Sequence, residues 1–269
     1  MAELPDFTAY REILRAQVRA QAQYRASFVV DLVGSMVSAA LDVATVFVLF
    51  SVTGGLGGFG GGPVLLMVAL SALAFSVADL AVGAADKLRE YVRNGLFDAL
   101  LLRPLSPLAQ LVVVNFAFRR IGRVAQAGVL YVVALAVGGV HWTPASAVLA
   151  VVAPVAGAVF FGSLFVAGGS VAFWWTESGQ VANAFTYGGR DFTSYPVTMF
   201  GDAFRALFAY ALGFGFVAYF PVLALLDRPD PLGAPHWVRW CSPAVAALAA
   251  CLAALVWRAG VRAYRSTGS

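Results

Sequence analysis

The stretch RNGLFDALLLRPLSPLAQLV, residues 93–112, decides how the chain is organised. It holds two arginines, an aspartate, an Asn–Gly pair and two prolines, although 61% of the whole sequence is hydrophobic. Such a stretch is unusual in a chain of membrane-protein composition. The sequence on either side of it indicates which surface it faces.

The composition is that of a membrane protein. Only 12% of the 269 residues are charged and the mean hydropathy is +0.81, whereas a soluble domain has about 25% charged residues. Several apolar runs exceed the ~18 residues that suggest a membrane span. The runs are continuous, and a β-barrel would need alternating polarity. The sequence therefore predicts an all-α polytopic membrane protein.

Six transmembrane helices are expected within a domain of residues 28–269, at 28–52, 63–85, 122–141, 147–173, 203–226 and 241–258. Between them lie a long polar segment (residues 86–121) and a second loop (174–202). Residues 108–121 are interpreted as a separate interfacial or cytoplasmic helix. Fused with the third span they would form a helix of ~50 Å, and the hydrocarbon layer is only ~30 Å thick.

Basic residues set the expected orientation. With both termini cytoplasmic, every Lys and Arg except Arg228 and Arg239 falls on the cytoplasmic side, as the positive-inside rule requires. All six tryptophans lie near expected span ends, where interfacial aromatic residues gather. The net charge of +4 thus reflects topology and gives no support to nucleic-acid binding.

Residues 1–27 are expected to form an amphipathic helix along the membrane. Apolar residues recur there at helical spacing, beside a basic row: Leu4, Phe7, Tyr10, Leu14 and Val18, with Arg11, Arg15 and Arg19. This pattern suits an anionic membrane surface. An ordinary solvated helix is the alternative.

The polar segment opens with an amphipathic pattern. On a helix beginning at Asp86, one side is apolar and the other charged, with Phe97 at the centre of the charged side. An exposed aromatic residue of this kind is a frequent interface anchor. Asn94–Gly95 offers an earlier helix end, and Pro104 and Pro107 prevent continuation. Two interpretations remain, namely a surface offered to a soluble partner and a solvated loop with incidental charges.

The segment GLFDALLLRPLSPLAQL resembles the loop between the second and third spans of ABC-2-type transporter permeases. That loop typically reads Gly–x–(Phe/Leu)–Asp–x–Leu–Leu–Leu–Arg–Pro–Leu, and the chain matches it at Gly95, Phe97, Asp98, Leu100, Leu101, Leu102, Arg103, Pro104 and Leu105. The stretches AQAQYRASFVVDLVGS, NAFTYGGRDFTSYPVTMF, FVAYFPVLALLDRPDPLG and GVRAYRSTGS also resemble the family. One departure is Ala218, where the family leads us to expect asparagine.

The resemblance implies an exporter subunit in a bacterial cytoplasmic membrane, working with a separate ATPase dimer and a second permease that is this chain or a paralogue. The ATPase would bind ATP and Mg²⁺, and the cargo would be amphipathic or hydrophobic. The polar segment would be the coupling helix that docks into the ATPase. The implied contact set is Arg89, Glu90, Arg93, Asn94, Phe97 and Asp98. Residues 187–195 would make a lesser contact.

No catalytic or cofactor site is expected in this chain. The glycine-rich run 54–62 lacks the Lys and Ser/Thr of a Walker loop, and no such motif occurs elsewhere. The chain is therefore expected not to hydrolyse ATP. The only histidines, His141 and His236, come from different loops, so no metal site is expected.

The first expected span carries a polar stripe: Asp31, Ser35, Ser38, Asp42 and Thr45. Their spacing places them on one helix face, and charged groups at this depth suggest function. A translocation path or permease-dimer contact is one interpretation, and a buried structural acid is the other. An alternative function is a proton- or ion-coupled secondary transporter that uses Asp31 and Asp42, although no internal repeat supports it.

Other intramembrane residues have simpler interpretations. Asp79, near the cytoplasmic end of the second span, is interpreted as structural. Small residues in the fourth span are expected to permit close helix contact: Gly157, Gly162, Gly168 and Gly169.

Overall fold

The structure is a computed structural model that describes residues 55–175 and 179–265, with a few separate positions before them: Tyr10, Arg15, Ala16, Val30, Val33, Gly34, Met36, Val37, Leu41 and Ala44. The expected interfacial helix (1–27) and first span (28–52) therefore lie almost entirely outside the described residues. So does the whole polar stripe from Asp31 to Thr45.

Regular structure in the described part is helical, apart from one bridge between Leu56 and Phe59. This confirms the predicted all-α class. The helices are α3 (Gly61–Val82), η1 (Gly83–Lys87), α4 (Leu88–Arg93), α5 (Leu96–Leu101), α6 (Pro107–Val114), α7 (Arg119–Val137), α8 (Pro144–Ser170), η2 (Val171–Phe173), α9 (Gly179–Thr193), η4 (Val197–Met199), α10 (Asp202–Arg205), η5 (Ala206–Ala211), η6 (Phe214–Phe216), α11 (Tyr219–Leu225), η7 (His236–Trp240) and α12 (Ser242–Ala263).

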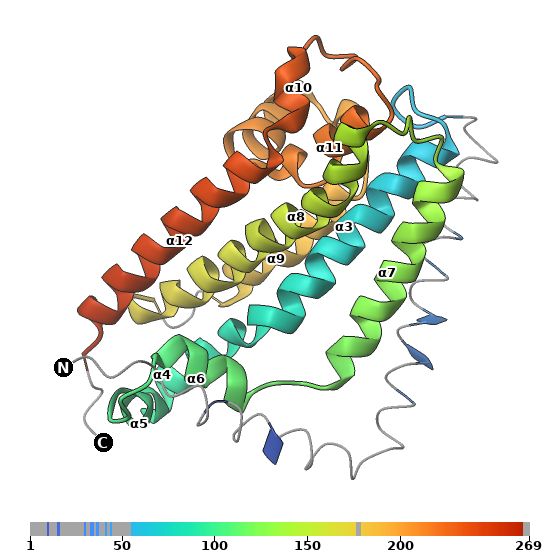
Figure 1. The fold of residues 1–269 in the computed structure, drawn as a ribbon. Coiled ribbons are helices and arrows are strands. Elements are labelled where there is room, and N and C mark those ends of the chain that lie inside the picture. Colours follow the sequence, from blue (N-terminus) through green and yellow to red (C-terminus); the bar gives the residue numbers. More distant parts are fainter. Residues whose placement is uncertain are drawn as a thin grey trace.

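The long helices form a bundle with α8 at its centre (Figure 1). Helices α3, α9 and α12 pack against α8, and α7 packs against α3. At one end, called the segment end here, α3, α8 and α12 finish beside the polar segment. At the opposite end, called the far end, the backbone N–H of His141 donates to the carbonyl of Leu225 at 2.9 Å. Helices α3, α8 and α12 therefore run in the same direction, and α7 runs opposite to them.

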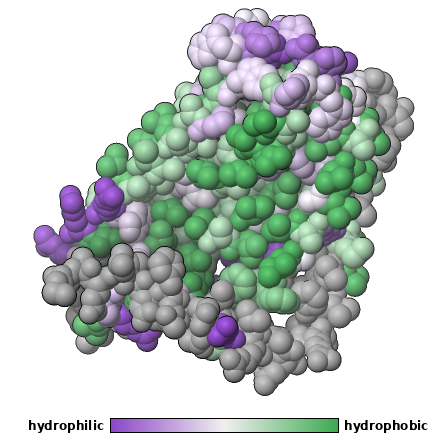
Figure 2. All heavy atoms as spheres, viewed as in Figure 1, coloured by the Kyte–Doolittle hydropathy of each residue, from purple (hydrophilic) through white to green (hydrophobic). Residues whose placement is uncertain are grey.

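Four described helices are long and apolar enough to cross a membrane: Gly61–Arg93, Arg120–Val137, Pro144–Phe173 and Ser242–Ala263. They correspond to the second, third, fourth and sixth expected spans. Figure 2 shows apolar residues over the middle of the bundle and hydrophilic residues gathered towards its ends. This distribution suits a bundle embedded in lipid, where helices satisfy their own backbone hydrogen bonds.

The prediction of one continuous fifth span at 203–226 is wrong. Two apolar pieces, Asp202–Ala211 and Phe214–Leu225, meet at an angle of 64°. The first piece ends in a π-helical turn, and Gly213 follows with φ +83°. Only glycine adopts such a backbone conformation at little cost, and it turns the chain between the two pieces.

The expectation that residues 174–202 form one loop at the segment end is also wrong. Gly179 lies against Arg89 at the segment end. The hydroxyls of Thr193 and Ser71 are 2.6 Å apart, and the Thr198 hydroxyl donates to the Gly57 carbonyl at 2.7 Å. Because Gly57 precedes α3 and Arg89 follows it, residues 179–198 run along the whole of α3.

Glycines of α8 bring neighbouring helices into close contact, as predicted. A Cβ atom on Gly157 would lie 2.7 Å from the Cβ of Ala74, and one on Gly169 would lie 2.5 Å from the carbonyl oxygen of Ala85. Gly157 thus faces the C-terminal half of α3, and Gly169 faces η1, directly after α3. Small residues at helix interfaces are the usual means of close approach in membranes.

Candidate functional site

The polar segment folds back on itself at Gly95. Helix α4 ends at Arg93, and the backbone N–H groups of Asn94 and Gly95 donate to the carbonyls of Glu90 and Val92 at 3.0 and 3.3 Å. Gly95 has φ +70°, the left-handed conformation typical of a residue just past a helix end. Of the two alternatives, Asn94–Gly95 therefore ends the helix, and α5 begins with a new phase.

Phe97 is not exposed, so its prediction as a surface anchor on the charged side is wrong. The turn at Gly95 rotates α5, and Phe97 points into a core with 0% exposure. Its ring lies 5.1 Å from Phe173, 4.9 Å from Tyr264 and 6.5 Å from Trp257, measured between centroids, all in edge-to-face geometry. Rings at these distances attract one another beyond simple burial.

These four aromatic residues, with the buried side chains around them, are called the aromatic cluster. Its remaining core members come from α4, α5 and α6: Leu88, Val92, Leu100 and Leu111. Phe173 belongs to η2 at the end of α8, and Trp257 to α12. The cluster therefore joins the polar segment to the ends of two transmembrane helices.

Two amide side chains hold the polar segment together internally. The Gln110 amide donates to the carbonyls of Leu100 and Leu105 at 2.9 and 3.0 Å, which fixes the turn between α5 and α6. Asn115 donates to the Tyr91 hydroxyl at 3.0 Å and accepts from the Lys87 ammonium at 3.1 Å. The prolines act as predicted, since α5 ends before Pro104 and α6 begins at Pro107.

The outer surface of the polar segment combines charges with leucines. Of the predicted contact residues, Glu90, Arg93 and Asn94 are exposed, and Arg89 and Asp98 are half-buried. Asp98 lies beside Tyr264, whose pKa is raised by burial and by this neighbouring acid. Five of the six predicted residues therefore lie at or near the surface, and Phe97 is buried.

Sequence reasoning missed the apolar part of this surface. Leu96, Leu101 and Leu102 are 51%, 43% and 86% exposed, and Arg103 beside them is exposed too. The name docking surface is used here for these four residues with Glu90, Arg93 and Asn94. The signal was the pair of leucines directly before Arg103 and Pro104, of which the continuous helical wheel assigned Leu102 to the apolar side.

A buried ion pair connects α3, the second expected span, to the start of α7. The Asp79 carboxylate is 3.3 Å from Arg120 Nε and 3.3 Å from an Arg123 guanidinium nitrogen. Arg120 also donates to the Asp79 carbonyl at 2.7 Å. Asp79 is only 5% exposed, and buried charges of this kind need partners. This geometry fits the predicted structural role of Asp79.

A second acid–tyrosine contact reaches α9. The Tyr187 hydroxyl donates to the Asp86 carboxylate at 3.1 Å, which fixes α9 against the turn after α3. Across residues 55–175 and 179–265, no three His, Cys, Asp or Glu side chains come close enough together to hold a metal ion.

The fold and this site define a polytopic helical membrane protein with an organised polar segment at one end. The family model described as ABC-2 family transporter protein matches residues 36–268. The chain therefore belongs to the ABC-2 family of transporter proteins. Membership implies that it is a permease subunit of an ABC transporter and that it works with an ABC ATPase. No curated protein and no solved structure matches the chain.

Proposed function

We propose that this chain is the non-catalytic permease subunit of an ABC exporter, and that the docking surface receives the mechanical work of a separate ATPase. The observation that carries the proposal is the combination of an exposed leucine–arginine surface with the rigid aromatic cluster behind it. An apolar centre beside charged groups is typical of protein interfaces.

The aromatic cluster supplies a route for force. Phe97 contacts Phe173 and Trp257, so a displacement of α5 moves the ends of α8 and α12 with it. Closure of two ATPase subunits on ATP and Mg²⁺ would push on the docking surface. Rigid-body motion of packed helices is a known way to convert such a push into alternating access.

The proposed assembly contains two permeases, either two copies of this chain or this chain with a related partner, and two ATPase subunits. The membrane is a bacterial cytoplasmic membrane, with both termini of the permease cytoplasmic. Basic residues gathered at the segment end support this orientation, among them Lys87, Arg89, Arg93, Arg103, Arg120, Arg123, Arg258 and Arg262. The cargo is an amphipathic or hydrophobic compound.

The test is copurification of the ATPase with a permease that carries Leu101→Asp and Leu102→Asp. Both side chains are exposed, so the permease should insert and fold normally. Truncating an interface anchor typically costs about 2 kcal/mol or more, so the ATPase should be lost. The matched control is Leu232→Asp at the far end, where Leu232 is 37% exposed. Equal ATPase recovery from the double variant and the control would refute the docking surface.

The secondary-transporter alternative has a separate test. Asp31 and Asp42 lie outside the described residues, so no contact in the structure favours it. Cargo movement in vesicles driven by a proton gradient without ATP or ATPase would support it, and a strict requirement for both would exclude it.

A further inference from the structure

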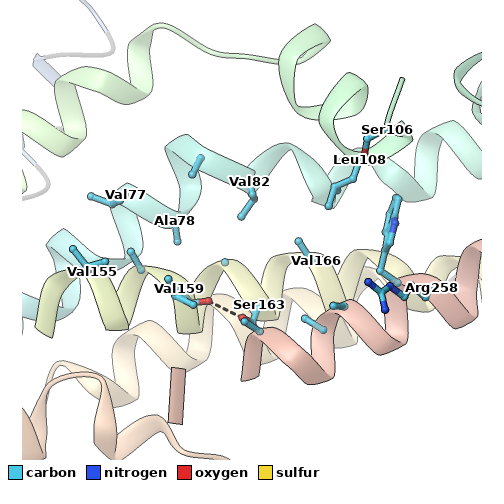
Figure 3. A pocket seen from close by; sticks show the side chains of 17 residues that line it. Val77, Ala78, Val82, Ser106, Leu108, Val155, Val159, Ser163, Val166 and Arg258 are labelled. Carbon is cyan, nitrogen blue, oxygen red and sulfur yellow. Dashed lines mark hydrogen bonds between the residues drawn. The ribbon is translucent and has the colours of Figure 1, made fainter. Parts of the chain in front are cut away.

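A cavity of about 630 Å³ lies between α3, α8 and α12, near the segment end (Figure 3). Its volume is within the range of about 300–1,000 Å³ usual for ligand pockets. Helix α3 contributes Val77 and Val82, α8 contributes Val155 and Val159, and α12 contributes Ala254. None of these residues belongs to the docking surface.

The cavity wall is apolar along its length. Ser163 is the polar residue of its middle part, and its hydroxyl donates to the Val159 carbonyl at 2.7 Å, within the same helix. Much of the remaining wall is made of small residues: Ala78, Ala81, Ala158, Gly162, Ala250, Ala253 and Ala254. Short side chains keep the space open, so it suits an apolar chain better than a polar molecule.

One end of the cavity is charged. Arg258 lies there, with Ser106 and Leu108 across from it (Figure 3) and with Trp257 beside it. Among the described residues, Arg258 makes no ion pair and no hydrogen bond. A basic residue near the end of a membrane helix reaches the lipid headgroup level, and tryptophan favours the same level.

The occupant must match both the apolar wall and the cation. A neutral hydrocarbon would leave Arg258 unmatched, and a small soluble anion would leave the apolar length unfilled. Lipid tails are as apolar as leucine, so an acyl chain gains little by leaving the bilayer for the cavity. Selectivity must therefore come from shape and from the headgroup charge.

We propose that this cavity binds one hydrocarbon chain of an anionic lipid, with the headgroup against Arg258. The inference concerns occupancy of the cavity and does not depend on the proposed transport. A rival occupant is the chain's own N-terminal part, because the backbone N–H of Ser106 donates to the Tyr10 hydroxyl at 3.0 Å at the same end.

The test uses the purified full-length chain in phosphatidylcholine vesicles. Photoactivatable phosphatidylglycerol or phosphatidylcholine, each with a diazirine in one acyl chain, is added, and labelled peptides are mapped by mass spectrometry. Phosphatidylglycerol should label the cavity-lining parts of α3, α8 and α12. Ala254→Phe should abolish this labelling, because the ring occupies the cavity. Arg258→Gln should lower the ratio of phosphatidylglycerol to phosphatidylcholine labelling by about two- to fivefold, the range expected for one partly exposed ion pair.

Two variants on the same helix are the matched controls. Leu255→Phe adds a ring at the next position, which is 60% exposed and does not line the cavity, and Arg262→Gln removes a charge four residues further on. Both should label as the unaltered chain does. Labelling that Ala254→Phe leaves unchanged, or equal labelling by the two lipids, would overturn the proposal. So would crosslinking of a photoreactive residue at position 254 to residues 1–54 in place of lipid.

Discussion

Phe97 shows at the scale of a single residue how one backbone angle can change a role. On a continuous helix Phe97 would lie among charged residues. The left-handed backbone conformation of Gly95 instead redirects the Phe97 side chain towards the other rings of the aromatic cluster. The exposed apolar residues of this surface are then Leu96, Leu101 and Leu102. Phe97 thus positions the docking surface, and the three leucines form the apolar part of that surface.

Replacing Phe97 with Ala should loosen the polar segment. Removal of a buried phenylalanine ring typically costs about 3–5 kcal/mol, and here the loss falls on the contact between α5 and the ends of α8 and α12. Trypsin should then cleave faster after Arg93 and Arg103, and thermal unfolding in detergent should begin at a lower temperature. Leu102→Ala removes a side chain that is 86% exposed and serves as the control. If both variants resist trypsin equally, the aromatic cluster does not hold the segment.

The sequence predicted the polar segment only in part, for a local reason. The motif, the prolines and the Asn–Gly pair were all recognisable, and the helix stop at Asn94–Gly95 was one of two open alternatives. The choice between them depends on whether the rings of Phe173, Trp257 and Tyr264 are present to receive Phe97. Those residues are far away in the sequence, so no local pattern could supply the answer.

At the scale of the element, α9 is the clearest departure from expectation. Its sequence includes Arg190 and Asp191, so it does not read as an apolar span. Its buried residues nevertheless form one face, Thr186, Gly189, Phe192 and Thr193, and Arg190 lies over the ring of Phe75 at 5.5 Å. Two threonines, one glycine and one phenylalanine thus form the buried face of α9 in place of a long apolar run. The four long helices were predicted correctly because hydropathy alone identifies them.

Two adjacent glycines of α9 provide a matched test of its contacts. A Cβ atom on Gly189 would collide with the ring of Phe214, whereas one on Gly188 would meet nothing within 4 Å. Gly188→Ala should therefore be neutral or should stabilise the protein by up to about 1 kcal/mol through helix propensity. Gly189→Ala should lower the unfolding temperature in detergent, because α9 must move away from Phe214 of η6. A reversed order would show that α9 does not pack against Phe214.

At the scale of the whole molecule, the helices place different parts of the chain at two opposite ends of the bundle. The polar segment, the end of α8 and the end of α12 share the segment end, and the loops around Gly57 and Leu225 share the far end. Residues 179–198 connect the two ends. The described part therefore separates Trp175 from Met199, which the sequence analysis had placed in one loop.

Cysteine labelling in intact cells tests this arrangement. In a background without Cys241 and Cys251, single cysteines replace Leu102, Trp175, Met199 or Leu232, all of which are at least 37% exposed. A membrane-impermeant maleimide should label the Met199→Cys and Leu232→Cys variants from outside. It should label the Leu102→Cys and Trp175→Cys variants only after the cells are opened. External labelling of Leu102→Cys would invert the topology, and failure to label Met199→Cys from outside would restore the single-loop interpretation.

Trp257 belongs to two neighbourhoods at once. Its indole lines the apolar cavity, and its ring centroid lies 6.5 Å from that of Phe97 and 5.7 Å from that of Phe173. The same side chain therefore belongs both to the wall of the apolar cavity and to the aromatic cluster behind the docking surface. A ligand that widens the cavity should therefore shift Trp257 and alter the packing of the aromatic cluster. Conversely, a displacement of the polar segment should change the width of the cavity.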